Sequence, residues 1–378
     1  MSIRTDQPVT LHPLVYLETG DEVTIGRRDI DSYGMFPPDG AALVRRLADG
    51  QTPEQAAAWY EREYGEPVDL DDLLDALNEL EFVSTRGTPP VEPVRWQRLG
   101  RALFSPPVAF LYLGLLIAAA VTVIRDPALL PRPEHLLFTE YVAIIELVLF
   151  LGAAPQLALH EICHALAGRR LGLHSRVRVS HRLYYLVLET SLDGLVTVPR
   201  RQRFLPILAG MLFELGALAA LILVAGASGG RTHQLCLAFA FATVLRLLWQ
   251  FFFYLRTDIY VLICTVLGCD DLHGAARAVL RNRWRRAPQP LDRWSSTDLR
   301  AARWYSWLIV VGYTASIGAF VLGILPVVYA MFATALGRLA GYHSTAELLD
   351  SAVFLSVNVI QGSITLWLTL RDRRRRQR

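Results

Sequence analysis

The chain has 378 residues, of which 53% are hydrophobic and only 19% are charged. A soluble domain of ordinary composition carries about 25% charged residues. The apolar residues gather after residue 105, in runs long enough to cross a bilayer. These values exclude a purely soluble globular protein.

The net charge of +3 combines two parts of opposite sign. Residues 1–105 carry 19 acidic residues against 10 arginines, whereas the rest of the chain carries 16 against 28. The arginines flank the apolar runs instead of forming one face, which argues against nucleic acid as a partner. Four cysteines without a CxxC pair argue against a disulfide framework. The polar, charged N-terminus predicts no cleavable secretion signal.

Residues 1–90 are expected to form a small α+β domain of winged-helix type, followed by a linker over 91–105. Turn residues separate short strand-like runs, which are Leu14–Leu17, Glu22–Ile25 and Ser32–Phe36. Capping residues and glycines then delimit three short helices. These helices are predicted from Asp39 as a cap to Leu47, from Thr52 to Tyr64, and from Asp69 to Leu80.

The second half predicts a membrane domain over 106–370 with about six spans, which makes the fold class mainly α. The apolar runs cover 106–124, 136–168, 205–227, 235–268, 304–336 and 352–370. The fourth run is long enough to be one tilted helix or two pieces that meet near Arg256. Pro326 is expected to bend the fifth.

The arginines also predict the orientation of the spans, because cytoplasmic loops are rich in basic residues. With residues 1–90 in the cytoplasm, 25 flanking arginines fall on the cytoplasmic side and four on the other. We therefore expect a protein of a bacterial-type plasma membrane with both termini, including the basic tail 371–378, in the cytoplasm. Residues 182–199 predict a cytoplasmic β-hairpin that turns at Asp193-Gly194.

The second apolar run ends in the sequence His160-Glu161-Ile162-Cys163-His164. Positions i and i+4 share one face of a helix, so both imidazoles can bind one Zn²⁺ ion, and Glu161 can act as general base toward a zinc-bound water. Two histidines and an acid are costly inside an apolar membrane helix unless they are used. The pattern therefore favours a zinc site over structural histidines.

A catalytic zinc site needs a third protein ligand, and three acids are candidates. Asp193 fits better as the turn of the hairpin. At about 1.5 Å of rise per residue, Glu214 and Asp258 both reach a depth similar to that of the histidines. Depth alone does not choose between these two acids.

The N-terminal segment resembles the PqqD-like domains that recognise leader peptides in peptide-modification systems. The resemblance rests on RRDIDSYGMFPPDGAALVRRLADGQTPEQAA from Arg27 and on DLDDLLDALNELEFV from Asp69. It implies that a peptide partner adds as an extra strand beside the sheet edge and the third helix. A DNA-binding winged helix is disfavoured by the nine excess acids.

The membrane domain resembles zinc peptidases related to site-2 protease, and more closely the branch found in peptide-maturation clusters. The matching motifs are HEICHALAGRRLGL from His160, AGMLFELG from Ala209 and RTDIYVLI from Arg256. The resemblance implies an aspartate on a later span as third ligand, which is Asp258 here. Glu214 then either contacts one of the metal ligands without binding the metal, or replaces Asp258 as the third ligand. The commoner pattern has an LDG string in the later span, whereas this chain has its LDG earlier, at Leu192.

Helix rise also predicts that Glu146 and Arg246 lie at similar depth and form a buried ion pair between the second and fourth spans. Cys163 faces away from the two histidines and is expected to be a packing residue.

These features predict an intramembrane zinc metalloendopeptidase that cleaves a ribosomally made peptide or a membrane-associated substrate, with Zn²⁺ as cofactor and the lipid bilayer as its surroundings. One alternative is a non-proteolytic membrane component that binds or exports a modified peptide, although such a protein needs no base at Glu161. The other is regulated intramembrane cleavage of a signalling protein. The substrate, the cleavage site and the oligomeric state are not encoded in any motif.

Overall fold

A computed structural model describes most of the chain. The described residues are 6–19, 22–27, 30, 32–84, 93–182, 185–269, 271–284, 290–291, 294–341 and 344–376. The chain divides into two compact units, of which one comprises Met1–Ser105, His164–Arg178 and Thr190–Pro206, and the other the remaining residues. Two of the boundaries fall inside helices α6 (Val142–Arg170) and α7 (Arg200–Ala227), so each of these continuous helices carries residues of both units.

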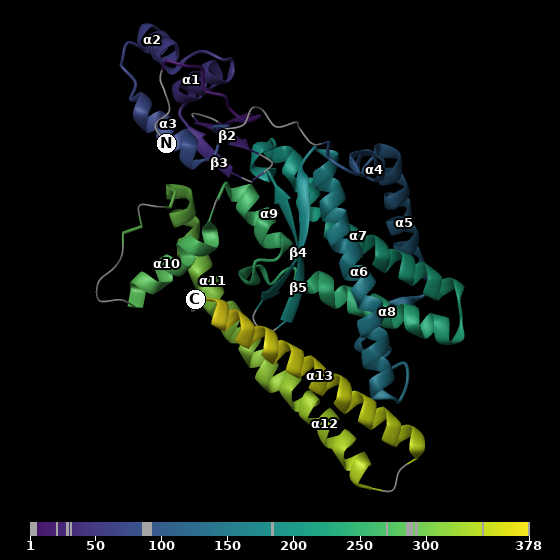
Figure 1. Ribbon diagram of the computed structural model, residues 1–378. Coiled ribbons are helices and arrows are strands. Elements are labelled where there is room, and N and C mark those ends of the chain that lie inside the picture. Colours follow the sequence, from purple (N-terminus) through teal and green to yellow (C-terminus); the bar gives the residue numbers. More distant parts are fainter. Residues whose placement is uncertain are drawn as a thin grey trace. The chain divides into compact units, whose positions relative to one another are not determined.

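The N-terminal residues form a three-stranded antiparallel sheet followed by three helices (Figure 1). The strands run in the order β1–β2–β3, and in the described part of the chain β2 pairs with both of its neighbours. Their bounds are β1 Val15–Thr19, β2 Glu22–Arg27 and β3 Ser32–Phe36, and the helices are α1 Pro38–Ala48, α2 Pro53–Tyr64 and α3 Leu70–Glu79. The expected strands and helices are therefore confirmed to within a few residues.

Local capping explains where two of these helices begin. Thr52 forms a capping box with Gln55 at the start of α2, and Asp69 accepts a hydrogen bond from the backbone N–H of Asp72 at the start of α3. The prediction that Asp39 caps α1 is wrong, because the helix begins one residue earlier with Pro38 at its first position. Asp39 instead accepts a hydrogen bond from the hydroxyl of Tyr60 on α2.

The interior of this sheet-and-helix layer is apolar. Its fully buried side chains come from the middle strand and from one face of each helix, and they include Ile25, Leu43, Leu47, Ala56 and Leu77. Ser32 at the start of β3 donates to the carbonyl of Leu80 over 2.8 Å, so this strand lies beside the end of α3. The expected linker over 91–105 contains a short helix, α4 (Gln97–Leu103).

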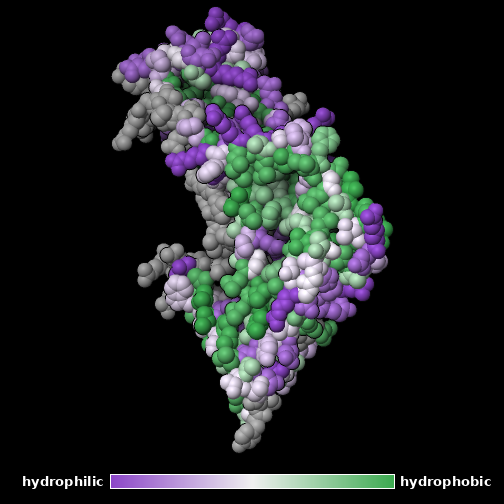
Figure 2. Space-filling view, turned by 90° about the vertical axis from the view of Figure 1, so that its right-hand side faces the viewer, coloured by the Kyte–Doolittle hydropathy of each residue, from purple (hydrophilic) through white to green (hydrophobic). Residues whose placement is uncertain are grey.

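Among the described residues, six helices are long and apolar enough to cross a membrane. These segments are Pro106–Arg125 (α5), Val142–Arg170 (α6), Arg200–Ala227 (α7), Gly230–Trp249 (α8), Ser296–Leu322 and Thr345–Leu368. Large apolar side chains are exposed on the surface of these helices, such as Phe110 and Leu111, which are each 75% exposed. Figure 2 shows hydrophobic side chains over a broad area of one face. Such a surface is typical of an integral membrane protein.

The fourth apolar run is broken, as one of the two alternatives predicts. Helix α8 ends at Trp249, a 3₁₀ turn spans Phe253–Leu255, and a new helix, α9, covers Asp258–Leu267. Arg256 joins them with a positive φ of 62°, a left-handed conformation that ends one helix and redirects the chain into the next. Helix α10 (Leu272–Trp284) follows α9.

The fifth run extends further than expected. Helix α11 (Ser296–Ala319) passes through a π-helical turn, Phe320–Ile324, into α12 (Leu325–Ala340). The turn ends two residues before Pro326, whose ring cannot fit a regular α-helical hydrogen-bond ladder. Helices α12 and α13 (Thr345–Arg376) lie side by side (Figure 1), and the predicted basic tail continues α13 as helix up to Arg376.

A two-stranded sheet lies between α6 and α7 in the sequence, but its turn is not where the sequence places it. The strands are β4 (His174–Arg182) and β5 (Tyr185–Asp193), which pair with each other, so Asp193-Gly194 comes after the second strand and not between the two; residues 183–184 lie outside the described residues. The prediction of a hairpin over 182–199 with its turn at Asp193-Gly194 is therefore wrong. Gly194, at φ 83°, instead leads from β5 into a 3₁₀ turn, Leu195–Thr197. A DG pair needs a positive φ after a strand as well as inside a hairpin, and the sequence does not distinguish the two.

Candidate metal centre

Helix α6 buries three polar side chains within one helical turn. His160, Glu161 and His164 are only 3%, 7% and 6% exposed. The helix is continuous through these residues, so the two histidines lie one turn apart on one face, as their spacing predicts. Burial of three ionisable groups on one helical turn is costly unless they have partners.

The first partner is Asp258, the first residue of α9. Its Oδ2 lies 3.1 Å from Nε2 of His160. Ligand atoms of His160, His164 and Asp258 all lie within 4.8 Å of one another, so these residues could hold one metal ion. Asp258 also sits at a helix N-terminus, where the partial positive charge of the backbone favours a carboxylate.

The donor set suits zinc. Catalytic zinc sites use three protein ligands, usually histidine nitrogens and a carboxylate oxygen, and keep the fourth position open. Two ligand atoms about 2.0–2.1 Å from a tetrahedral zinc ion lie about 3.3 Å apart. The 3.1 Å between His160 and Asp258 is close to this value. Asp258 is 26% exposed, so this side of the cluster is less enclosed than the histidines.

A backbone carbonyl orients the ring of His164. Nδ1 of His164 lies 2.7 Å from the carbonyl oxygen of Pro206 on α7. Because a carbonyl only accepts, Nδ1 carries the proton and Nε2 keeps its lone pair. This is the usual way in which a protein sets the tautomer of a metal-binding histidine.

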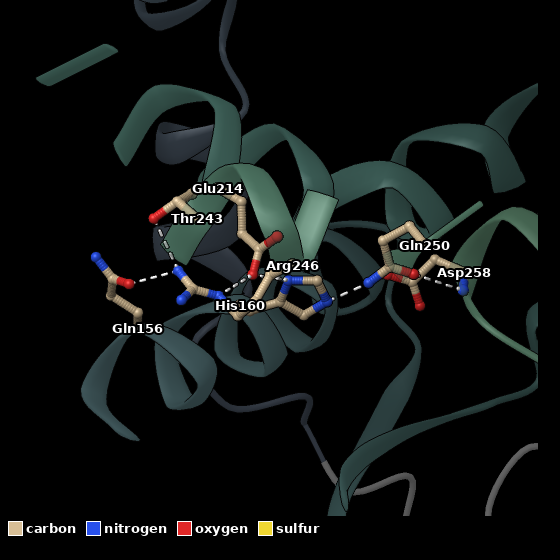
Figure 3. Close-up of polar contacts among 7 residues, drawn as sticks. All are labelled: Gln156, His160, Glu214, Thr243, Arg246, Gln250 and Asp258. Atoms are coloured by element: carbon tan, nitrogen blue, oxygen red, sulfur yellow. Dashed lines mark hydrogen bonds and ion pairs between the residues drawn. The ribbon is translucent and has the colours of Figure 1, made fainter. Parts of the chain in front are cut away.

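A buried carboxylate faces the other nitrogen of His160. Oε1 of Glu214, on α7, lies 3.5 Å from Nδ1 of His160, and the Glu214 residue is 2% exposed. The same oxygen accepts a hydrogen bond from Nε of Arg246 over 3.0 Å. His160 therefore has a carboxylate at each ring nitrogen, Glu214 at Nδ1 and Asp258 at Nε2 (Figure 3).

Arg246, on α8, is held by two more side chains. It donates to the amide oxygen of Gln156 on α6 and, over 3.0 Å, to the hydroxyl of Thr243 one turn earlier on α8. Figure 3 shows this network beside His160. The predicted ion pair between Glu146 and Arg246 is wrong: Arg246 pairs with Glu214, and Glu146 accepts from the side chain of Asn358, at 3.0 Å to the nearer oxygen. Helix rise gives depth, but it does not say which helices are neighbours.

The remaining candidates have simpler outcomes. The side chain of Asp193 lies outside the described residues, and the backbone places Asp193 at the end of β5. Cys163 is a half-buried free thiol and is not in the metal-ligand group found among the described residues.

Sequence reasoning missed Gln156, Pro206 and Thr243, and it also missed Gln250, whose side-chain amide oxygen accepts a hydrogen bond from the backbone N–H of Asp258. Their amide, carbonyl and hydroxyl groups belong to no motif, so only the contacts between helices reveal them.

Comparison with known proteins gives no match to a family model, a curated protein or a solved structure.

Proposed function

We propose that this protein is an intramembrane zinc metallopeptidase, with His160, His164 and Asp258 as the zinc ligands and Glu161 as the general base. The observation that carries the proposal is the cluster of these three ligands within 4.8 Å, on helices of a strongly apolar domain. The buried Glu161 beside it favours hydrolysis over simple metal storage, because a binding site needs no base. The resemblance to membrane zinc peptidases agrees with this chemistry.

Zinc in this site would polarise the scissile carbonyl and make a bound water nucleophilic near neutral pH. Glu161 would accept a proton from a water in this site and pass it to the leaving amine. His160 and His164 would hold the ion through neutral nitrogens, and Asp258 would supply a negative oxygen that offsets part of its charge. The apolar helices around the cluster limit the entry of bulk water, which strengthens each electrostatic contact.

The N-terminal domain would bind the substrate peptide through the edge of its sheet. In the described part of the chain β3 pairs only with β2, and its Met35 is 65% exposed. An open edge offers backbone donors and acceptors to an added strand. Helix α3, beside β3, carries acidic residues such as Asp72 and Glu79, which favour a leader segment with basic side chains.

The test separates enzyme from scaffold. Peptide products are compared in cells that carry the wild type and Glu161→Ala, and zinc is measured on both purified proteins. We expect Glu161→Ala to keep zinc and to abolish processing. Unchanged processing by a zinc-loaded Glu161→Ala protein would refute the peptidase proposal and favour a role in binding or exporting the peptide.

The third ligand is tested by zinc content alone. Asp258→Ala should lose zinc, whereas Glu214→Ala should retain it at reduced affinity. The reverse pattern would assign the ligand position to Glu214.

A further inference from the structure

The end of helix α8 lies beside both carboxylates that flank His160. Arg246 and Gln250 are four residues apart, so they lie on the same face of the helix end. Arg246 donates to Glu214, and Gln250 accepts from the backbone N–H of Asp258 over 3.1 Å. The last turn of α8 therefore contacts both acids: it bonds to the side chain of Glu214 and to the backbone N–H of Asp258 (Figure 3).

The contact with Asp258 is part of a local clamp. Besides the Gln250 side chain, the backbone carbonyl of Gln250 accepts a hydrogen bond from the hydroxyl of Thr257 over 2.6 Å. These two bonds tie the start of α9 to the end of α8 across the left-handed turn at Arg256. The direction in which the Asp258 side chain leaves the helix is thereby fixed relative to α8.

The contact with Glu214 fixes the second carboxylate in the same frame. Glu214 is 2% exposed, and the guanidinium of Arg246 is its charge partner at 3.0 Å. A buried carboxylate without such a partner would take up a proton or move. Gln156 and Thr243 hold Arg246 in turn, so the position of Glu214 is set by three helices together.

We propose that Arg246 and Gln250 are positioning residues that set the geometry of the metal site through the two carboxylates. Arg246 keeps Glu214 at Nδ1 of His160, which directs Nε2 of that ring to the metal. Gln250 keeps Asp258 on the Nε2 side as the third ligand. The depth of the two acids does not decide which of them is the metal ligand. In this proposal one turn of α8 decides it, by placing Asp258 on the metal side of His160 and Glu214 on the other side. This inference rests on the proposed zinc site.

The experiment measures the affinity of the full-length protein, purified in detergent, for Zn²⁺ by competition with a chromogenic chelator. Arg246→Met and Gln250→Met should each weaken zinc binding about 10–100-fold, the range seen when a group supporting a metal ligand is lost. Arg246→Lys keeps the charge and Gln250→Glu keeps the acceptor, so both should recover most of the affinity. Glu146→Gln is the matched control, since it alters a glutamate that bonds to Asn358 and not to the metal site.

Cobalt substitution distinguishes positioning from loss of the fold. Arg246→Met and Gln250→Met should give the wild-type absorption band of four-coordinate Co²⁺ at higher cobalt concentration, because the ligands are unchanged. Asp258→Ala should alter the band itself.

The outcomes separate the two proposals. If the wild type binds zinc and both methionine variants bind it within about threefold, the positioning role is refuted while the peptidase proposal stands. If both variants lose the band entirely and the conservative variants do not restore it, the residues hold the fold and not the site geometry. If the wild type binds no zinc, the zinc site itself is refuted.

Discussion

The buried ion pair between Glu214 and Arg246 permits a quantitative prediction that is independent of metal. At 3.0 Å the charges attract by about 5.5 kcal/mol with an effective dielectric constant of about 20, and desolvation offsets much of this. The two side chains differ in exposure, at 2% for Glu214 and 23% for Arg246. Removal of the arginine therefore strands the more deeply buried charge.

We expect Arg246→Met to reduce the free energy of unfolding by about 3–5 kcal/mol, the cost of leaving a buried charge without its partner. Glu214→Gln should cost less, about 2 kcal/mol, because Arg246 is partly exposed and keeps its bonds to Gln156 and Thr243. The double variant should cost less than the sum of the two by about 1–3 kcal/mol, since it strands neither charge.

The assay is reversible unfolding of the full-length protein in detergent micelles by added sodium dodecyl sulfate, followed by circular dichroism in the presence of a chelator. Glu146→Gln serves as control and should stay within about 1 kcal/mol of the wild type, because its partner Asn358 is neutral. A double-variant cost equal to the sum within about 0.5 kcal/mol would refute the coupling. A larger cost for Glu214→Gln than for Arg246→Met would refute the argument from burial.

Further predictions concern the N-terminal domain and two helical glycines. The hydrogen bond from Tyr60 lowers the pKa of Asp39 and raises the pKa of Tyr60 to about 12, so Tyr60→Phe should cost about 1 kcal/mol of unfolding free energy near neutral pH. The stabilisation from the Asp39 carboxylate is lost as pH falls below its ordinary pKa of about 4, and the stabilisation from the Tyr60 hydroxyl is lost as pH rises from 10 toward 12. The difference in unfolding free energy between wild type and Tyr60→Phe, measured across pH, should therefore shrink at both extremes. A pH-independent difference would contradict the assignment. Gly100→Ala places a Cβ against the backbone carbonyl of Leu166, so it should lower the free energy of unfolding, measured by thermal unfolding, by about 1–3 kcal/mol. Gly114→Ala is the control: its added Cβ meets nothing within 4 Å, so it should be neutral or stabilising by up to about 1 kcal/mol. Equal effects of the two substitutions would show that the close approach of Gly100 to Leu166 is not rigid.

Local patterns were sufficient for much of the fold. The strands and helices before residue 85 follow from turn residues and caps, and the apolar helices follow from run length and hydropathy. The pairing of His160 with His164 is equally local, because four residues of helix always bring two side chains to one face.

The errors arose where a local signal fits more than one structure. The Asp193-Gly194 pair satisfies a hairpin turn, yet it ends a strand here, because register depends on the partner strand. Asp39 could cap a helix, but Pro38 starts α1 one residue earlier and leaves that carboxylate for Tyr60 on the next helix.

The sequence by itself determined which residues are polar inside apolar helices and how deep each one lies. The tertiary structure decided which of them meet: Asp258 at one nitrogen of His160, Glu214 at the other, and Arg246 with Glu214 instead of Glu146. The physical reason is that depth follows from the fixed rise of a single helix. Neighbour order and rotation about the helix axis follow from side-chain packing between segments far apart in the chain.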